Sequence, residues 1–548
     1  MPLQPDAPQV IGTYDIAYAR LMQMERKFAR DPALREKYTK FMRDYEELNH
    51  MSRVPVQKHH SDTAIYIPHH AAGTEKFRTV FDGSAKAENG ISINDIQLNG
   101  EKVQPELITT LMRFRTHRVA LTADVSKMYR QILIAEDQRD MQRILWREST
   151  DEPVREYWLN TQTYGNKSAA YVSIRTMDYM ADEFATEFPA ASRAVKTSFY
   201  VDDALSGSHD VESAIGLHRE LIEMFGRRKM ELAKWNTNDP VMRKHIKSSG
   251  CQLIELNKEE TTAVLGMHWD ANEDTFQYII KNPIRLENAT KRSISSDIAR
   301  LYDPCGYLSC VVIFAKVVLK DLWIDKLDWD DTVEGEPLER WKQFAMELPN
   351  ITAVRIPRWI NTDLKSKKQL HAFADASQTG YGTKFYLRQQ RDDEPVTVHL
   401  VFAKARVAPV KGSTIPKLEL TACHLTAQLL EGTIREAAPS APHMGGLHEA
   451  AVKSAKSHLK RVIGGQQLTF EQLATLLTQV EACLNSRPLI ALSDDATDDL
   501  ALTPGHFLVG EPLVASLSRD YTTTAANRLR NFELMTKMTQ EFWQRWSH

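Results

Sequence analysis

The sequence has few cysteines and no long apolar run, and each scarcity excludes a class of protein. Its 548 residues include five cysteines without Cys-X-X-Cys spacing or a neighbouring His-X-His pattern, so we expect reduced thiols and no structural zinc site. No stretch approaches the roughly 20 consecutive apolar residues that span a bilayer, and no basic-then-apolar leader opens the chain. The sequence therefore predicts an intracellular protein without a membrane partner, in the cytoplasm, the nucleus or both.

The chain also lacks an excess of charge of either sign. The formal net charge is −3, so a nucleic-acid channel would need a local concentration of lysine and arginine. A hydrophobic content of 42% is ample for buried cores, and a chain of this length predicts about three or four domains. Overall charge is therefore uninformative about partners, and the functional evidence lies in motifs.

Two adjacent aspartates stand at the tip of a predicted hairpin. The segment 200–203, Tyr-Val-Asp-Asp, lies between the short apolar runs 197–199 and 204–205, which predicts two strands joined by a tight acidic turn. Adjacent carboxylates repel unless a cation holds them, and an oxygen-only ligand set suits Mg²⁺. For Asp202 and Asp203 alone, a solvated turn is the more common explanation.

A third aspartate changes that balance. Asp124 ends the predicted strand 119–123, and the order of a strand with its aspartate, a long insert and a Tyr-X-Asp-Asp hairpin resembles the palm of reverse transcriptases. Three carboxylates can hold two Mg²⁺ ions, or Mn²⁺ in their place, to activate a primer 3′-hydroxyl and stabilise the leaving pyrophosphate. Asp124, Asp202 and Asp203 are therefore the predicted catalytic and metal-binding residues.

Several longer stretches narrow the resemblance to the Pol polyprotein of BEL/Pao long-terminal-repeat retrotransposons. The resemblance implies an RNA-directed DNA polymerase that binds an RNA or DNA primer-template and adds deoxynucleoside triphosphates. It also places Val125, directly after Asp124, among the metal-binding residues. The matching stretches are 66–70, 77–85, 91–95, 142–147, 265–269 and 291–306.

The same resemblance implies two contacts with the incoming nucleotide. Arg78 would grip the triphosphate, because a guanidinium fork suits planar oxygen clusters; the alternative is an ordinary surface arginine. Tyr129 would be the aromatic gate that collides with a ribose 2′-hydroxyl, and the alternative is a packed tyrosine. Tyr200 is the first residue of the acidic turn and is included in the substrate site.

Further residues are assigned to the nucleic acid. Gly165 resembles the turn that supports the template base, since glycine permits close backbone approach, although Ala170 replaces the proline that is usual in the family. Lys234 and Trp235 follow the basic stretch 227–229 and could hold the primer strand by phosphate contact and stacking. The alternative for Trp235 is a tryptophan packed under a charged surface.

A second set of acids begins at Asp375, at the end of the predicted strand 370–375. Glu419 lies near the start of a predicted helix that has Pro416 in its first turn. These residues resemble the first two acids of RNase H, which holds two metals with three or four acids. Because no later strand supplies the third acid, we expect this partial RNase H site to be inactive.

The resemblance changes at a junction near Ser440. Segments 443–453, 483–489 and 502–507 resemble the end of a BEL/Pao integrase core, in which Glu449 would be the final acid of an Asp-Asp-Glu site. Both aspartate partners are missing, and one carboxylate cannot hold two metals, so we expect no DNA integration. Our hypothesis is that an internal deletion or an exon-joining error removed the intervening sequence.

Together these motifs predict an α+β right-hand polymerase of fingers, palm and thumb, followed by a partial RNase H-like α/β domain and a mostly helical partial integrase segment. The favoured function is that of an RNA-directed DNA polymerase, a nucleotidyltransferase of a BEL/Pao-like element. The alternative is a non-catalytic retrotransposon remnant or a co-opted nucleic-acid-binding protein, and the oligomeric state is open. The expected boundaries are a helical leader over 1–50, fingers and palm over 51–235, thumb and connection over 236–362, the RNase H-like part over 363–440 and the integrase part over 441–548.

Overall fold

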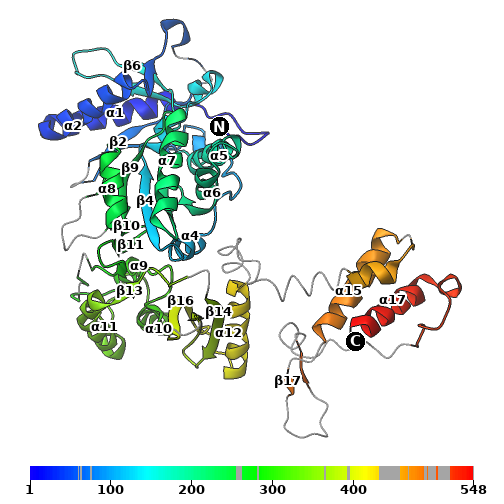
Figure 1. Ribbon diagram of the computed structural model, residues 1–548. Helices are drawn as coiled ribbons and strands as arrows, with labels where there is room; N and C mark the ends of the chain where they lie inside the picture. The colour runs from blue at the N-terminus through cyan, green and yellow to red at the C-terminus, as the bar shows by residue number, and fades with distance from the viewer. Residues whose placement is uncertain are drawn as a thin grey trace. The chain divides into compact units, whose positions relative to one another are not determined.

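The computed structural model divides the chain into two compact units (Figure 1). The first unit comprises Met1–Leu308, Lys326–His371 and Tyr386–Val401, and the second comprises Ser309–Asp325, Ala372–Phe385 and Phe402–His548. The structure describes residues 1–59, 61, 64–73, 77–254, 262–280, 283–284, 286–362, 366–391, 395–430, 457–466, 468–486, 490–491, 501–503 and 519–546. Ser440 and Glu449 lie outside the described residues.

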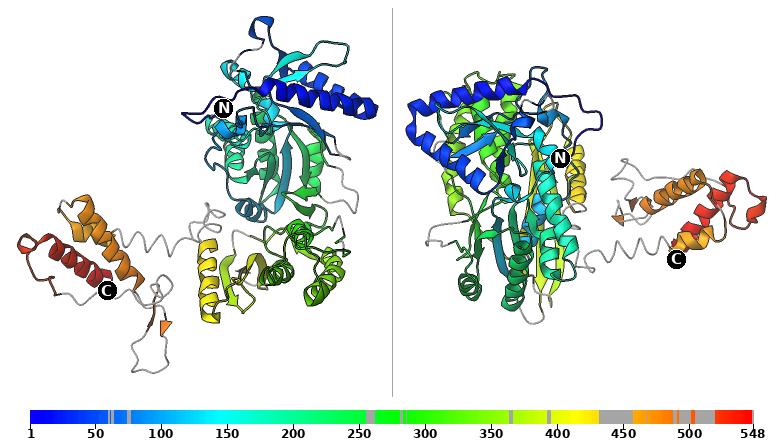
Figure 2. Two further views of the ribbon diagram at one scale, coloured as in Figure 1. Left: turned by 180° about the vertical axis from the view of Figure 1, so that it is seen from behind. Right: turned by 90° about the horizontal axis from the view of Figure 1, so that it is seen from above.

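Two consecutive helices open the first unit and contact each other; they diverge from their junction in the view from above (Figure 2). α1 spans Thr13–Arg30, and α2 spans Pro32–Glu47. Asp31 is the N-cap residue of α2, and its side chain accepts a hydrogen bond from the Leu34 amide at 3.0 Å. The helices bury residues at spacings of three and four, as an amphipathic helix does. Their buried residues, Ala17, Leu21, Met24, Phe28, Tyr38, Met42 and Tyr45, share one hydrophobic core with Ile65, Phe81, Ile144 and Trp146. Residues 1–50 are therefore packed into the segment that follows them.

Short strands complete this N-terminal core. β1 (Met51–Arg53), β6 (Arg155–Leu159) and β5 (Arg143–Trp146) form an antiparallel sheet in that order, and β2 (His69–Ala72) pairs with β3 (Arg78–Phe81) as a hairpin. The short helix α3 (Ile93–Ile96) and three 3-10 helices connect them. The 3-10 helices are Val56–Lys58, Met128–Gln131 and Glu136–Met141.

The central sheet of the first unit has four antiparallel strands in the order β7-β8-β4-β9. Their bounds are Phe199–Tyr200, Asp203–Ser208, Val119–Val125 and Leu232–Thr237. The sequence-predicted strand 119–123 and the acidic hairpin are confirmed, but Thr197 and Ser198 end a helix that Pro189 begins, so the expected strand at 197–199 is wrong for those two residues. The neighbouring helices are α4 (Leu107–Phe114), α5 (Ala169–Glu183), α6 (Pro189–Ser198), α7 (Val211–Arg227) and α8 (Pro240–Ser248).

A second four-stranded sheet follows in the first unit, in the order β10-β11-β12-β13. Arg358 comes directly after β13, and its side chain is fully buried in an ion pair with Asp274. Arg358 also donates hydrogen bonds to the carbonyl oxygens of Phe114 and His117 at 2.6 and 2.7 Å, so it caps the end of α4. The bounds are β10 Thr262–Val264, β11 Met267–Asp270, β12 Thr275–Gln277, β13 Arg355–Pro357, α9 Lys291–Arg300, α11 Gly335–Glu347 and the 3-10 helix Leu348–Ala353.

A three-stranded sheet in the order β14-β15-β16 contributes residues to both units, and α10 (Ser309–Ile324) and α12 (Ile415–Leu429) belong to the second. The strands span Lys367–Ala376, Gly380–Gln390 and Thr397–Val407. Within the second unit the Phe385 and Phe402 rings stack with centroids 4.3 Å apart. The strand at 370–375 and the helix that begins at Ile415 with Pro416 in its first turn are confirmed.

The last described elements are helices. α15 (Phe470–Asn485) and α17 (Asn531–Trp546) pack together through Leu476, Val480, Met535, Met538 and Phe542. β17 (Ile490–Ala491) pairs with β18 (Ala501–Leu502), and a 3-10 helix spans Ala526–Arg528.

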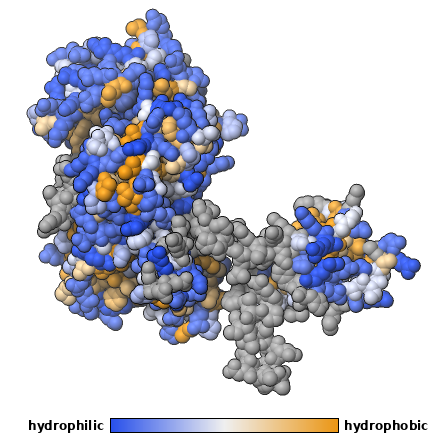
Figure 3. Space-filling model, viewed as in Figure 1, coloured by the Kyte–Doolittle hydropathy of each residue, from blue (hydrophilic) through white to orange (hydrophobic). Residues whose placement is uncertain are grey.

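The described part of the structure has a mainly hydrophilic surface on the face shown in Figure 3, as expected from a sequence without a long apolar run. No helix among the described residues is long and apolar enough to cross a membrane. All five cysteines are free thiols.

Candidate active site

The three aspartates predicted from the sequence come together at one end of the central sheet. Asp124 lies directly opposite Asp203 in the antiparallel register of β4 and β8. The backbone amide of Val125 donates a hydrogen bond to the carbonyl oxygen of Asp202 at 2.8 Å, which ties the acidic turn to β4. A cavity of about 140 Å³ borders this end of the sheet and is lined by Asp124, Asp203 and Lys234.

The turn that carries two of these acids has an unusual backbone. Because Tyr200 pairs with Asp203, Val201 and Asp202 are the two central residues of the turn. Val201 has a φ of 56°, in the left-handed region that the first central position of a type II′ turn requires and that glycine usually fills. For a β-branched residue this conformation is an outlier, so surrounding contacts must maintain it.

Burial and mutual repulsion weaken the acidity of the pair on the turn. Burial, followed by the charges of Asp202 and Asp124, raises the pKa of Asp203 to about 6. Burial also raises the pKa of Asp202, and the charge of Asp124 adds to that shift. A carboxylate whose ionised form is disfavoured in this way is stabilised by a bound cation.

Lys234 supplies positive charge to this cluster. Its Nζ forms an ion pair with the Asp124 carboxylate, while 60% of its side chain stays exposed. Lys234 has a φ of 54° on β9, where the register against β4 shifts between Thr122 and Asp124. The sequence placed Lys234 against the primer strand; the structure places it against an acid of the cluster, a contact that no local pattern signals.

The stacking role predicted for Trp235 is contradicted by its burial. Only 1% of the residue is exposed, and its indole N–H donates to the Leu232 carbonyl oxygen at 3.0 Å. The ring packs on His218 at a centroid distance of 4.5 Å. No face of Trp235 is left for a nucleobase, so the packed alternative holds.

The donor chemistry of the site fits Mg²⁺. Asp124, Asp202 and Asp203 offer only oxygen ligands, the kind that this ion prefers. The side chain of Val125 has no donor atom, so only its backbone carbonyl could join them. The three aspartates share one end of the sheet, but among the described residues no three His, Cys, Asp or Glu side chains form a ready-made metal site.

Two of the predicted nucleotide contacts are partly defined. Tyr129 lies on the 3-10 helix Met128–Gln131, and burial, followed by the charge of Asp202, raises the pKa of its phenol. Arg78 is exposed at the start of β3. The roles of both residues in nucleotide binding stay predictions.

Gly165 occupies a position that requires glycine. Its φ is 101°, and an added Cβ would lie 2.3 Å from the carbonyl oxygen of Phe81. The Asn94 side-chain amide donates to the Gly165 carbonyl oxygen at 2.9 Å and fixes the loop. Ala170 is the second residue of α5, in a first turn that accepts proline or alanine alike.

The two RNase H-like acids are both exposed. Asp375 is the second-last residue of β14, and its carboxylate accepts a hydrogen bond from the Ala376 amide at 2.8 Å, while Glu419 lies in the first turns of α12. The incomplete acid set expected from the sequence stays a prediction.

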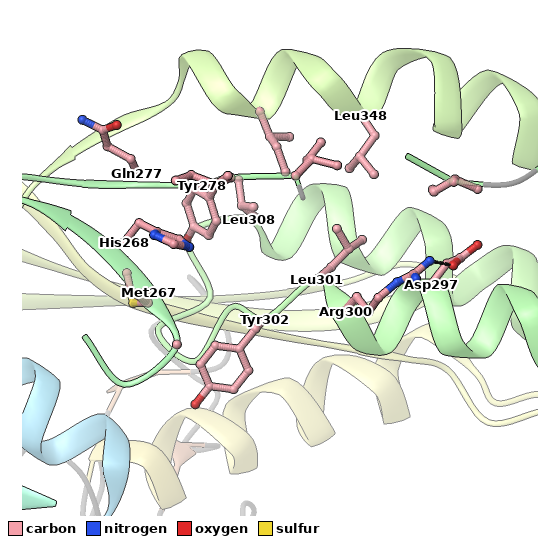
Figure 4. A pocket seen from close by; sticks show the side chains of 15 residues that line it. Met267, His268, Gln277, Tyr278, Asp297, Arg300, Leu301, Tyr302, Leu308 and Leu348 are labelled. Carbon is pink, nitrogen blue, oxygen red and sulfur yellow. Dashed lines mark hydrogen bonds and ion pairs between the residues drawn. The ribbon is translucent and has the colours of Figure 1, made fainter. Parts of the chain in front are cut away.

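A larger cavity of about 310 Å³ lies in the first unit and contains none of the predicted acids (Figure 4). Its walls are mainly apolar and come from β11, β12, α9 and the segments around them. The ion pair between Asp297 and Arg300 lies at its edge. Its labelled apolar and aromatic lining includes Met267, Tyr278, Leu301, Tyr302, Leu308 and Leu348.

The raised pKa of Asp203 predicts a pH-dependent gain in stability for Asp203→Asn in the absence of divalent metal. The carboxyl ionises near pH 4 in the unfolded chain and at about pH 6 in the folded one, so the folded state is penalised increasingly as pH rises between these values. After allowance for partial exposure we expect Asp203→Asn to gain about 1 kcal/mol at about pH 8 and nothing at about pH 4, measured as slower amide hydrogen exchange in peptides from β4 and β8. An equal gain at both pH values would contradict this electrostatic account.

Comparison with known families identifies part of the chain directly. Residues 290–444 match the Pao retrotransposon-like RNaseH-like domain. This segment of the chain is therefore similar to a domain of Pao retrotransposons. The match begins within the segment expected to form thumb and connection, upstream of the RNase H-like part expected from residue 363. No curated protein matches the chain significantly.

A solved structure is similar to this chain over much of its length. It is the foamy viral protease-reverse transcriptase dRH in complex with double-stranded DNA, with a TM-score of 0.44 and 11% sequence identity. The similarity covers 71% of this chain and 59% of that one, so the chain spans less than two thirds of that protein's length.

Proposed function

We propose that this chain is an RNA-directed DNA polymerase of a Pao-type retrotransposon. The observation that carries the proposal is the register that sets Asp124 opposite Asp203, beside Asp202 on a Tyr-Val-Asp-Asp turn. Three carboxylates at one end of an antiparallel sheet, bordered by a cavity, suit phosphoryl transfer better than a structural role, because their charges destabilise the folded state unless a cation binds.

Asp124, Asp202 and Asp203 would hold two Mg²⁺ ions, for which Mn²⁺ can substitute, with the carbonyl of Val125 nearby. When bound, these ions supply Lewis-acid activation of a primer 3′-hydroxyl and neutralise charge at the phosphorus under attack. Lys234, whose Nζ pairs with the Asp124 carboxylate, would place its positive charge beside a phosphate of the substrate.

The remaining residues would bind the substrates. Tyr129, beside Asp202, would exclude the 2′-hydroxyl of a ribonucleotide, and Arg78 would contact the triphosphate of a deoxynucleotide. Tyr200 and Gly165 would flank the RNA or DNA primer-template. The central sheet would be the palm of a right-hand polymerase, the N-terminal core its fingers, and the segment 236–362 its thumb and connection.

The other two activities of a Pol polyprotein are not part of this proposal. For Asp375 and Glu419 the sequence predicts no further acid of a two-metal RNase H site. The integrase remnant rests on Glu449, which lies outside the described residues.

Primer extension tests the proposed function. The full chain, given an RNA template, an annealed DNA primer, deoxynucleoside triphosphates and Mg²⁺, is expected to lengthen the primer, and removal of the metal with a chelator to stop it. A DNA template in a parallel reaction separates RNA-directed from DNA-directed synthesis. No extension on either template by folded protein would overturn the proposal and leave the non-catalytic remnant.

A further inference from the structure

The turn at residues 200–203 contains a valine in an unfavourable backbone conformation, which contacts from other segments must maintain. Among the described residues other than glycine that have a positive φ, Val201 is the only β-branched one. Branching at Cβ makes the left-handed region especially unfavourable, so a free Val201 would return to negative φ. That change would rotate the peptide group that leads into Asp202.

Contacts from two distant segments hold the central residues of the turn. The Val201 amide donates a hydrogen bond of 3.0 Å to Oε1 of Gln104, a residue 97 positions away in the chain. The carbonyl oxygen of Asp202 accepts the bond from Val125 on β4. The second contact is part of the sheet edge, whereas the first depends on one side chain.

Gln104 is itself well placed to act as a fixed support. It stands just before Pro105, which restricts the backbone of the preceding residue, and Pro105 leads into α4, which contacts both β7 and β8. Val103, Gln104 and Pro105 also line a small cavity together with Val201. The segment therefore reaches the turn from an element packed against the same hairpin.

We propose that Gln104 is a positioning residue that holds Val201 in its left-handed conformation and so aligns Asp202 with Asp124 and Asp203 for divalent metal. This inference rests on the proposed function for its catalytic consequence. Asp124 and Asp203 lie opposite each other on the interior strands β4 and β8 and keep their places without Gln104. Loss of the support therefore misaligns Asp202 against the other two acids, which weakens metal binding and turnover more than it weakens binding of the primer-template.

Three variants of the full chain separate this role from a general structural one. Gln104→Leu removes the acceptor, Val201→Gly removes the strain, and the double variant combines them. Gln104→Leu is expected to raise the Mg²⁺ concentration for half-maximal extension and lower kcat by about tenfold each, with an unchanged KM for primer-template. In the Val201→Gly background, Gln104→Leu should change neither value by more than about twofold, since glycine accepts the turn unaided.

The matched control alters the same segment without touching the turn. Lys102 forms an exposed ion pair with Glu106, and Lys102→Met should leave kcat and the Mg²⁺ midpoint unchanged. A loss with Gln104→Leu that persists in the Val201→Gly background would overturn the proposal, because it would show that Gln104 does not act through the strained residue.

A measurement without turnover keeps this inference separate from the proposed function. Mn²⁺ binding, followed by the electron paramagnetic resonance signal of the free ion, needs neither primer nor nucleotide. We expect Gln104→Leu to weaken Mn²⁺ binding by about tenfold and Val201→Gly to restore it. If the unaltered chain binds Mn²⁺ but extends no primer, the proposed polymerase fails while this result still decides the role of Gln104; equal Mn²⁺ binding by Gln104→Leu and the unaltered chain overturns the inference.

Discussion

Asp203→Asn should lower the rate of primer extension at saturating Mg²⁺ by at least about a thousandfold, equivalent to roughly 4 kcal/mol of transition-state stabilisation. Asparagine keeps the size of the side chain but has one carbonyl oxygen and no charge, so it cannot replace a carboxylate as a metal ligand. Asp202→Asn should have an effect of the same order, because both acids lie on one turn against Asp124. Single-turnover extension with each variant measures the loss.

The chain offers a matched control for these substitutions. Asp210 caps α7 by accepting a hydrogen bond from the Ser213 amide at 2.8 Å, and asparagine caps helices equally well. Asp210→Asn, seven positions from Asp203, should therefore extend primers at the rate of the unaltered chain. An Asp203→Asn protein that stays folded and retains a tenth or more of the activity would show that this carboxylate is not part of the reaction.

The candidate site could be predicted because its acids are encoded locally. Asp124 ends an apolar strand pattern, and Asp202 and Asp203 follow a short strand at a predicted hairpin, so each position was visible within a few residues of sequence. The pairing of the two segments followed from the family resemblance, and the structure confirms it in the register of β4 and β8. The RNase H-like helix was readable for the same reason, since Pro416 marks its first turn.

The supports of the site could not be predicted, because they join segments far apart in the chain. The ion pair between Lys234 and Asp124 depends on a register shift in the sheet, and the bond from Val201 to Gln104 spans 97 residues. Neither of these two contacts produces a periodic pattern in the sequence. The burial of Trp235 is likewise decided by what α7 and α8 cover, whereas its neighbours in sequence are polar and charged.

The packing of the N-terminal helices was also missed. Their charge density suggested a leader without chemistry, yet one face of α1 and α2 completes a core with β2, β3 and β5. Arg130, next to Tyr129, lies over the rings of Phe41 and Tyr45 at 5.1 and 4.5 Å, so α2 contacts the segment that carries a proposed nucleotide residue. A charged helix with an apolar stripe is ambiguous in sequence until its partner is known.

The largest loss of stability should come from Arg358→Met. The Arg358 guanidinium is fully buried and forms two hydrogen bonds with Asp274, at 2.6 and 2.8 Å, besides those to the carbonyl oxygens at the end of α4. Removing it leaves a half-buried carboxylate and several carbonyl groups without their donor. Breaking a buried pair in this way costs about 3 to 5 kcal/mol.

Because the chain contains two units, global unfolding is not a two-state process, and local opening is the better measure. Amide hydrogen exchange in peptides from α4 and β13 should become at least about a hundredfold faster in Arg358→Met. Arg292 and Asp330 form the same two-bond geometry, at 2.7 and 2.9 Å, with side chains that are 63% and 74% exposed. Water can solvate Asp330 when the Arg292 guanidinium is removed, so Arg292→Met should leave the rate of amide hydrogen exchange unchanged. If the two variants behaved alike, burial of Arg358 would not be what makes its ion pair important, and the link between α4 and the second sheet of the first unit would have to rest on its apolar contacts alone.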